Sequence, residues 1–122
     1  MQILREIKKW YKIPDDPEGT ELYIRLLSAG EIAEIASKTQ RTLFADGRPS
    51  VEIDHALDGM LTAEKALVGW RNLLDDGMPV EYSRKNLRKV LAEVPGLAVQ
   101  IAEFHRQLAG ESGKIEEDVE KD

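Results

Sequence analysis

The sequence contains no cysteine, which excludes disulfide bonds, thiolate metal sites and cysteine nucleophiles. It also has no apolar run close to the roughly 18 residues that a membrane-spanning helix needs. The first ten residues are rich in charge and lack the apolar core of a secretory signal peptide. We therefore expect an intracellular protein that does not associate with a membrane.

Histidine is scarce as well, and the residues that carry chemistry are not grouped. His55 and His105 are the two imidazoles, and neither has the spacing of a zinc site. Asp54 and Asp58 lie near His55, but no second group of hard ligands would complete a metal site with them. Acids at a helix start are also favoured by the helix dipole. No glycine-rich phosphate loop or nucleophile elbow is present. The sequence therefore predicts no catalytic residue, no metal site and no cofactor.

The chain is long enough for one domain, and its charge is unevenly distributed along the sequence. Its 122 residues should bury roughly two thirds of the surface that the unfolded chain exposes. The net charge is −6, and residues 111–122, with six acids and two lysines, carry −4 of it. We expect a single domain over 1–110 and a disordered acidic tail over 111–122. An acidic chain is also a poor default partner for nucleic acid or an anionic membrane.

Two segments indicate β-hairpins. Residues 5–13 fit a helix or a strand, but the dense turn residues of 14–19 and the alternation of 22–26 favour a strand, so that 5–13 becomes the first arm of a hairpin. The second hairpin is expected over 42–53. Asp46-Gly47 is a strong signal for its turn, and Pro49 indicates an edge position.

The remaining segments indicate helices. Ser28 and Glu31 form a capping box, which predicts a helix that ends near Gln40. Residues 54–74 give the strongest helical pattern, and Asp75-Asp76-Gly77 would end that helix. Its apolar stripe consists of Leu57, Met60, Leu61, Leu67, Trp70 and Leu74.

Two further helices complete the expected fold. Ser83 caps the first, and Pro95 starts the second, which repeats apolar residues at Leu97, Ile101, Phe104 and Leu108 and ends at Gly110. The predicted class is α+β, mainly α, with an N-terminal β-hairpin packed on a small bundle of three to four helices and the disordered acidic tail.

Candidate partner-binding residues lie in two places. Trp10 is flanked by lysines on a possible edge strand and is a better candidate for an exposed contact than Trp70, which we expect in the core. A basic cluster follows Ser83, with its charges on adjacent rows of one helix. The candidate residues are Trp10, Tyr11, Arg84, Lys85, Arg88 and Lys89.

Several blocks of the sequence resemble the small tail assembly chaperones of long-tailed, siphovirus-type bacteriophages or prophages. The first is Lys8-Lys-Trp-Tyr-Lys-Ile-Pro-Asp-Asp-Pro-Glu-Gly-Thr20, followed by Ile24-Arg-Leu-Leu-Ser-Ala-Gly-Glu31. The second runs from Ala66-Leu-Val-Gly-Trp70 to Asp76-Gly-Met-Pro79, followed by Tyr82-Ser-Arg-Lys-Asn86-Leu. The resemblance as a whole extends over residues 8–108.

The resemblance implies a role in binding rather than catalysis. Such chaperones bind the long, aggregation-prone tape-measure protein and recruit subunits of the major tail-tube protein around it. They work in the cytoplasm of the bacterial host, are absent from the mature virion, and could form homo-oligomers. A helical tape-measure protein would dock in an apolar groove or along a sheet edge.

A small DNA-binding regulator is the alternative. Residues 28–48 resemble the first helix and turn of a helix-turn-helix, and the basic cluster at 84–89 could contact phosphates. However, Asp46-Gly47 falls where the recognition helix should run. We therefore expect no nucleic-acid partner.

Overall fold

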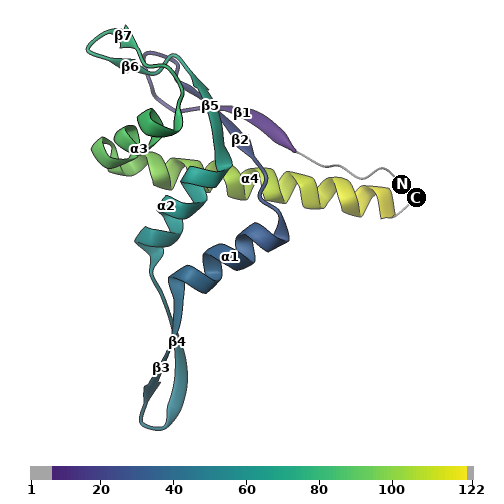
Figure 1. Ribbon diagram of the computed structural model, residues 1–122. Helices are drawn as coiled ribbons and strands as arrows, with labels where there is room; N and C mark the ends of the chain where they lie inside the picture. Colours follow the sequence, from purple (N-terminus) through teal and green to yellow (C-terminus); the bar gives the residue numbers. More distant parts are fainter. Residues whose placement is uncertain (1–6, 121–122) are drawn as a thin grey trace.

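The computed structural model describes residues 7–120, and the side chains of residues 7–111. Its architecture is α+β, as predicted: a long helix crosses a three-stranded sheet, and a hairpin extends away from the other helices (Figure 1). The helices are α1 (Ala29–Thr39), α2 (His55–Ala66), α3 (Arg84–Glu93) and α4 (Pro95–Glu120). The strands are β1 (Lys8–Lys12), β2 (Glu21–Arg25), β3 (Gln40–Ala45), β4 (Arg48–Ile53), β5 (Leu67–Arg71), β6 (Leu74–Asp75) and β7 (Met78–Pro79).

The predicted N-terminal hairpin is confirmed as β1 and β2, and residues 5 and 6 of its first arm lie outside the described residues. The strands are antiparallel, with Tyr11 opposite Leu22. The Asp16 carboxylate closes the turn by accepting a hydrogen bond from the Thr20 amide at 2.8 Å. Hydrogen bonds from Thr20 and Glu18 to the Asp16 carboxylate lower its pKa to about 2.

The inner face of the sheet packs on α4. Tyr11, Leu22 and Ile24 point to this side and are buried. The Tyr11 ring stacks on Phe104 of α4, with ring centroids 4.8 Å apart. Because the predicted row of apolar residues on α4 is buried against this face, the sheet and α4 form one core.

The expectation of one helix over 54–74 is wrong in its second half. α2 ends at Ala66, and residues 67–71 form β5, which pairs with the free edge of β2. Leu67 and Trp70 are buried there, as the apolar stripe required, but on a strand. The physical reason is that β2 needs a second neighbour, and hydrogen bonds to its edge outweigh the local helical pattern.

Asp76-Gly77 is the turn of a small hairpin and not a simple helix stop. Both residues have positive φ, 48° and 77°, as a two-residue turn of type I′ requires. Trp70 is held beside this hairpin, because its indole N–H donates to the Val80 carbonyl at 2.7 Å. Tyr82 crosses the Trp70 ring edge-on and donates its hydroxyl to the Leu67 carbonyl at 2.7 Å.

The second predicted hairpin is confirmed as β3 and β4, joined by Asp46-Gly47 with φ of 53° and 73°. The Asp54 amide donates to the Thr39 carbonyl at 2.7 Å and closes the base of the hairpin. Since α1 leads into this hairpin and not into a second helix, the helix-turn-helix interpretation of residues 28–48 is wrong.

The capping box of α1 is confirmed and joins a larger polar junction. The Ser28 hydroxyl accepts a hydrogen bond from the Glu31 amide, and the Glu31 carboxylate accepts one from the Ser28 amide. The same carboxylate also accepts hydrogen bonds from both terminal nitrogens of Arg25, at 2.8 Å each. The Arg25 guanidinium lowers the pKa of Glu31 to about 2. His105 of α4 accepts the Leu27 amide on Nε2 at 3.1 Å, which ties α4 to the start of α1.

The last two helices begin where predicted, after the cap Ser83 and at Pro95, but α4 does not end at Gly110. Its backbone is helical as far as Glu120, so the segment expected as a disordered tail is helical over 111–120. Residues 121 and 122 lie outside the described residues. Gly110 and Gly113 each cost a helix only about 1 kcal/mol, and the neighbouring Glu and Lys are good helix formers. Glu111 also pairs with Lys9 of β1, at 2.9 Å.

Within residues 7–120, no helix is both long enough and apolar enough to cross a membrane.

Candidate functional site

Trp10 lies on the outer face of the sheet and is already engaged by its own chain. Its ring stacks on Tyr23 of β2, with centroids 4.6 Å apart, and the Arg71 guanidinium lies 3.8 Å from its centroid. Gly69 of β5 lies beside the indole, and a Cβ there would be 3.8 Å from it, an ordinary van der Waals distance. Trp10 is half-buried, so only part of the ring is open to a partner.

Tyr11 is not an exposed contact residue. Its side chain is 8% exposed and packs in the core against Phe104, and burial raises the pKa of its hydroxyl. The reason is the alternation of a strand, which turns Tyr11 inward when Trp10 points outward. The expectation that both residues contact a partner is therefore wrong for Tyr11.

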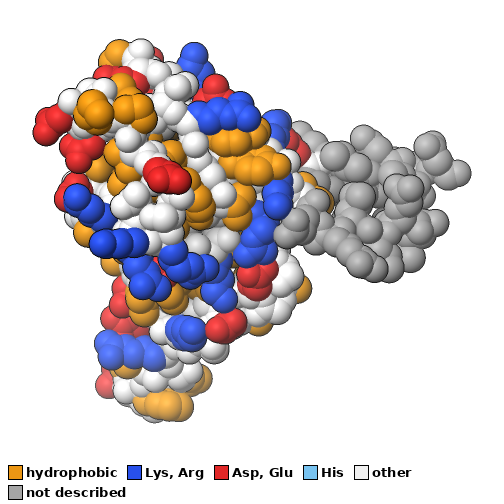
Figure 2. All heavy atoms as spheres, turned by 45° about the horizontal axis from the view of Figure 1, so that its top comes forward, with side chains coloured by type: hydrophobic (Ala, Val, Ile, Leu, Met, Phe, Trp, Pro, Cys, Tyr) orange, Lys and Arg blue, Asp and Glu red, His pale blue; other side chains and the backbone are white. Residues whose placement is uncertain are grey.

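The predicted basic cluster is exposed on α3. Arg84, Lys85, Arg88 and Lys89 all face solvent, and Arg88 lies 3.9 Å from Glu64 of α2. Figure 2 shows Lys and Arg side chains in a band across the middle of the molecule. The cluster and Trp10 do not form one site, because α3 and β1 lie on opposite sides of β5 in Figure 1.

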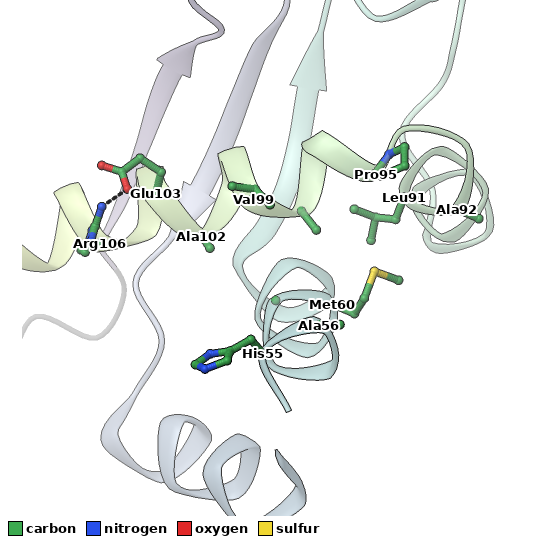
Figure 3. Close-up of a pocket in the computed structure, with 12 residues that line it drawn as sticks. His55, Ala56, Met60, Leu91, Ala92, Pro95, Val99, Ala102, Glu103 and Arg106 are labelled. Atoms are coloured by element: carbon green, nitrogen blue, oxygen red, sulfur yellow. Dashed lines mark hydrogen bonds and ion pairs between the residues drawn. The ribbon is translucent and has the colours of Figure 1, made fainter. Parts of the chain in front are cut away.

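An apolar groove between α2, α3 and α4 was not predicted. It has a volume of about 620 Å³ and is called the α2–α3–α4 groove below. Figure 3 shows residues of all three helices around it, with the Glu103–Arg106 ion pair at one end and His55 near the start of α2. Its lining is mostly apolar or small: Ala56, Gly59, Met60, Leu91, Ala92, Pro95, Ala98, Val99 and Ala102. Val99 is 71% exposed, so the groove is open to a partner.

The hairpin of β3 and β4, residues 40–53, is the second unpredicted surface and is called the arm below. Every residue of both strands is exposed. Residues opposite each other on paired strands share a face, so the register separates an apolar face from one that carries the Arg41–Glu52 ion pair. The apolar face consists of Thr42, Phe44, Pro49, Val51 and Ile53. Phe44 is 77% exposed, and Figure 2 shows hydrophobic atoms at the lower end of the arm.

Sequence reasoning missed both surfaces for different reasons. The arm was predicted as a hairpin, and the alternation of Phe44 with its neighbours could have shown that one face is apolar. The groove depends on how three helices meet, and its alanines and glycine carry no signal of their own.

The acids near His55 have structural roles. Asp54 caps α2 by accepting the Leu57 amide at 3.1 Å, and Asp58 accepts the Thr62 hydroxyl. Among the residues that the structure describes, no group of three or more His, Asp or Glu could hold a metal ion.

No family model, no curated protein and no solved structure matches this chain.

Proposed function

We propose that this chain is a tail assembly chaperone of a long-tailed bacteriophage or prophage. It binds the tape-measure protein, helps to recruit tail-tube subunits, and acts by binding and not by catalysis. The proposal starts from the resemblance of residues 8–108. It places the protein in the cytoplasm of the bacterial host and outside the mature virion.

The observation that carries the proposal is the α2–α3–α4 groove. A tape-measure protein is a long helix with apolar stripes, and such a helix binds by laying its apolar side in a groove. The groove lining includes the small side chains of Ala56, Ala92 and Ala102, so a partner helix can approach the three helices closely. The exposed Val99 would then be covered by the partner, which adds apolar burial to the complex.

Co-expression with the tape-measure protein tests the proposal. The partner is the very long helical open frame expected downstream of the gene, and the readout is co-purification and solubility of that protein. Val99→Glu places a charge in the groove and should reduce recovery at least about tenfold. Met78→Glu, which changes an exposed apolar residue in β7, is the matched control and should bind like the wild type.

Two results would contradict the proposal. One is a wild-type chain that neither retains the tape-measure protein nor keeps it soluble. The other is an equal loss for both variants, because the groove would then have no special role.

A further inference from the structure

A hollowed surface lies where the turn between β1 and β2, the segment between β5 and β6, and α3 meet. Its two adjoining hollows have volumes of about 440 and 180 Å³ and share Leu73, Leu74, Val90 and Val94 in their walls. Leu74 and Val94 are exposed to solvent. The surface therefore has apolar side chains that remain open to a partner.

The rim of this surface, which is called the acidic surface below, carries negative charge. Among the described residues that line it, the one base is Lys89, and the acids are Asp15, Asp16, Glu18, Asp75 and Glu93. No ion pair between side chains of residues 7–111 neutralises these acids, whereas acids elsewhere, such as Glu31 and Glu64, pair with arginine. Figure 2 shows acidic and hydrophobic side chains together at its upper left, on the side where Figure 1 shows β6 and β7. Unneutralised charge beside exposed apolar groups is complemented by a ligand of opposite charge.

Hydrogen bonds hold the walls of the acidic surface in place before any partner binds. The Thr20 hydroxyl donates to the Asn72 carbonyl at 3.0 Å, and the Asn72 side-chain amide donates to the Gly19 carbonyl at 3.2 Å. These two bonds join the turn between β1 and β2 to the segment after β5. The Val80 amide donates to the Leu73 carbonyl at 2.9 Å and closes that segment. A partner therefore binds without the cost of ordering these loops.

α3 separates the acidic surface from the α2–α3–α4 groove. Val90, Glu93 and Val94 line the acidic surface, whereas Leu91 and Ala92 line the groove. With about 3.6 residues per turn, these two sets lie on opposite sides of the helix. A partner on the acidic surface therefore leaves the groove open.

The charge and the apolar walls together define the partner. The rim repels a nucleic acid or an anionic membrane, and a small cation would leave Leu74 and Val94 uncovered. A peptide segment with both kinds of side chain satisfies the whole surface, because its apolar side chains cover Leu74 and Val94 while its Lys or Arg side chains face the acids. We propose that the acidic surface binds a cationic amphipathic segment of another protein while the groove remains free.

A labelled synthetic peptide that repeats Lys-Leu-Leu-Lys over about four helical turns tests the inference. The purified full chain is added up to about 1 mM, and fluorescence anisotropy gives the affinity. We expect binding that weakens as the salt concentration rises, because charges at an exposed rim are screened. Replacing every Lys of the peptide by Glu, or every Leu by Ser, should weaken binding at least about tenfold.

A lysine placed on the acidic surface should repel the peptide. Leu74→Lys should weaken binding at least about tenfold. Leu43→Lys is the matched control, because the two leucines lie on two-stranded hairpins and are similarly exposed, at 43% for Leu74 and 41% for Leu43. Circular dichroism checks that the variants fold, and Leu74→Ser with Leu43→Ser replaces the pair if either does not.

Removing charge from the rim tests the ionic part of the contact. Asp75→Asn combined with Glu93→Gln should weaken binding at least about threefold and make it less sensitive to salt. The matched control is Asp46→Asn combined with Glu52→Gln, which makes the same two changes on the arm and should bind like the wild type.

Val99→Lys distinguishes the acidic surface from the groove. Val99 lines the groove, so this variant should bind the peptide like the wild type. The test uses no tape-measure protein, so its failure is separate from a failure of the proposed function.

Three results would overturn the inference. The first is a wild-type chain that does not bind the Lys-Leu-Leu-Lys peptide at the highest concentration. The second is equal binding of the peptide with Glu in place of Lys, because the charge of the rim would then have no role. The third is a loss for Leu43→Lys or Val99→Lys as large as that for Leu74→Lys, because the peptide would then lie elsewhere.

Discussion

At the scale of single residues, the buried Tyr11 hydroxyl destabilises the core. It is buried, and it has no hydrogen-bond partner among the described residues. A buried polar group without a partner loses its hydration and regains nothing. The ring is retained by its stack on Phe104, which does not need the hydroxyl.

Tyr11→Phe should therefore stabilise the protein. We expect the free energy of unfolding in urea to rise by about 1 kcal/mol. Tyr82→Phe is the matched control, because the Tyr82 hydroxyl donates to the Leu67 carbonyl, and its loss should lower that free energy by about 1 kcal/mol. If Tyr11→Phe destabilised as much as Tyr82→Phe, the Tyr11 hydroxyl would have a partner in solution.

His105 should make stability depend on pH. Burial lowers its pKa below the ordinary value of 6.5, and Arg25 lowers it further, while Glu31 acts in the opposite direction. The imidazole of the unfolded chain therefore binds a proton more readily than that of the folded chain. The stability that neutral His105 contributes to the folded state is fully present above pH 6.5, and it is lost as the pH falls below 6.5 toward the lower pKa of the folded state.

Thermal unfolding between pH 7.5 and 5 measures this effect. The melting temperature of the wild type should fall as the pH drops below 6.5, and His105→Gln should flatten that part of the curve. His55→Gln is the control for loss of an exposed imidazole. A His105→Gln curve parallel to the wild type would contradict the assignment.

At the scale of elements, the sequence predicted local features better than pairings. Turns and caps such as Asp46-Gly47, Ser28 and Ser83 were found, because their side chains act on neighbouring backbone. Residues 67–71 were assigned to the wrong element, since Leu67 and Trp70 fit a helical stripe as well as a strand. The choice is made by the free edge of β2, which lies far away in the sequence.

The candidate site shows the same division. The exposed position of the basic residues on α3 could be predicted, because their spacing is local. The inward position of Tyr11 followed from the predicted strand, yet the residue was still assigned to a contact surface. The groove could not be predicted, since it exists only where α2, α3 and α4 meet.

The arm should be removable without loss of the body. Arg41 and Glu52 are opposite each other near its base, and on the side of the body the Asp54 amide donates to the Thr39 carbonyl. Replacing residues 42–51 by Asn-Gly joins Arg41 to Glu52 by a two-residue hairpin turn in the same register as the present turn between Ala45 and Arg48. We expect the free energy of unfolding to change by less than about 1 kcal/mol. A body that no longer unfolds cooperatively would show that the arm is part of the core.

At the scale of the whole molecule, α4 joins every part of the core. Ile101 is fully buried, and Val99 on the same helix is open to solvent. Ile101→Ala should lower the free energy of unfolding by about 2–5 kcal/mol, and Val99→Ala should change it by no more than about 0.5 kcal/mol.

Because there is one core, both variants should unfold in a single transition. Circular dichroism and tryptophan fluorescence should give the same midpoint in urea for each of them. Separate midpoints would mean that the sheet and the helices unfold independently.

The position of β2 between β1 and β5 has a consequence for the growing chain on the ribosome. β1 and β2 follow each other closely, but residues 26–66 separate β2 from β5. At about 5–20 residues per second, roughly 2–8 s pass before the synthesis of β5 begins, and α4 comes later still. During this time Leu22 and Ile24 have no α4 to cover them. The order of synthesis therefore leaves the buried residues of β2 uncovered until α4 has been synthesised, and the core can close only then.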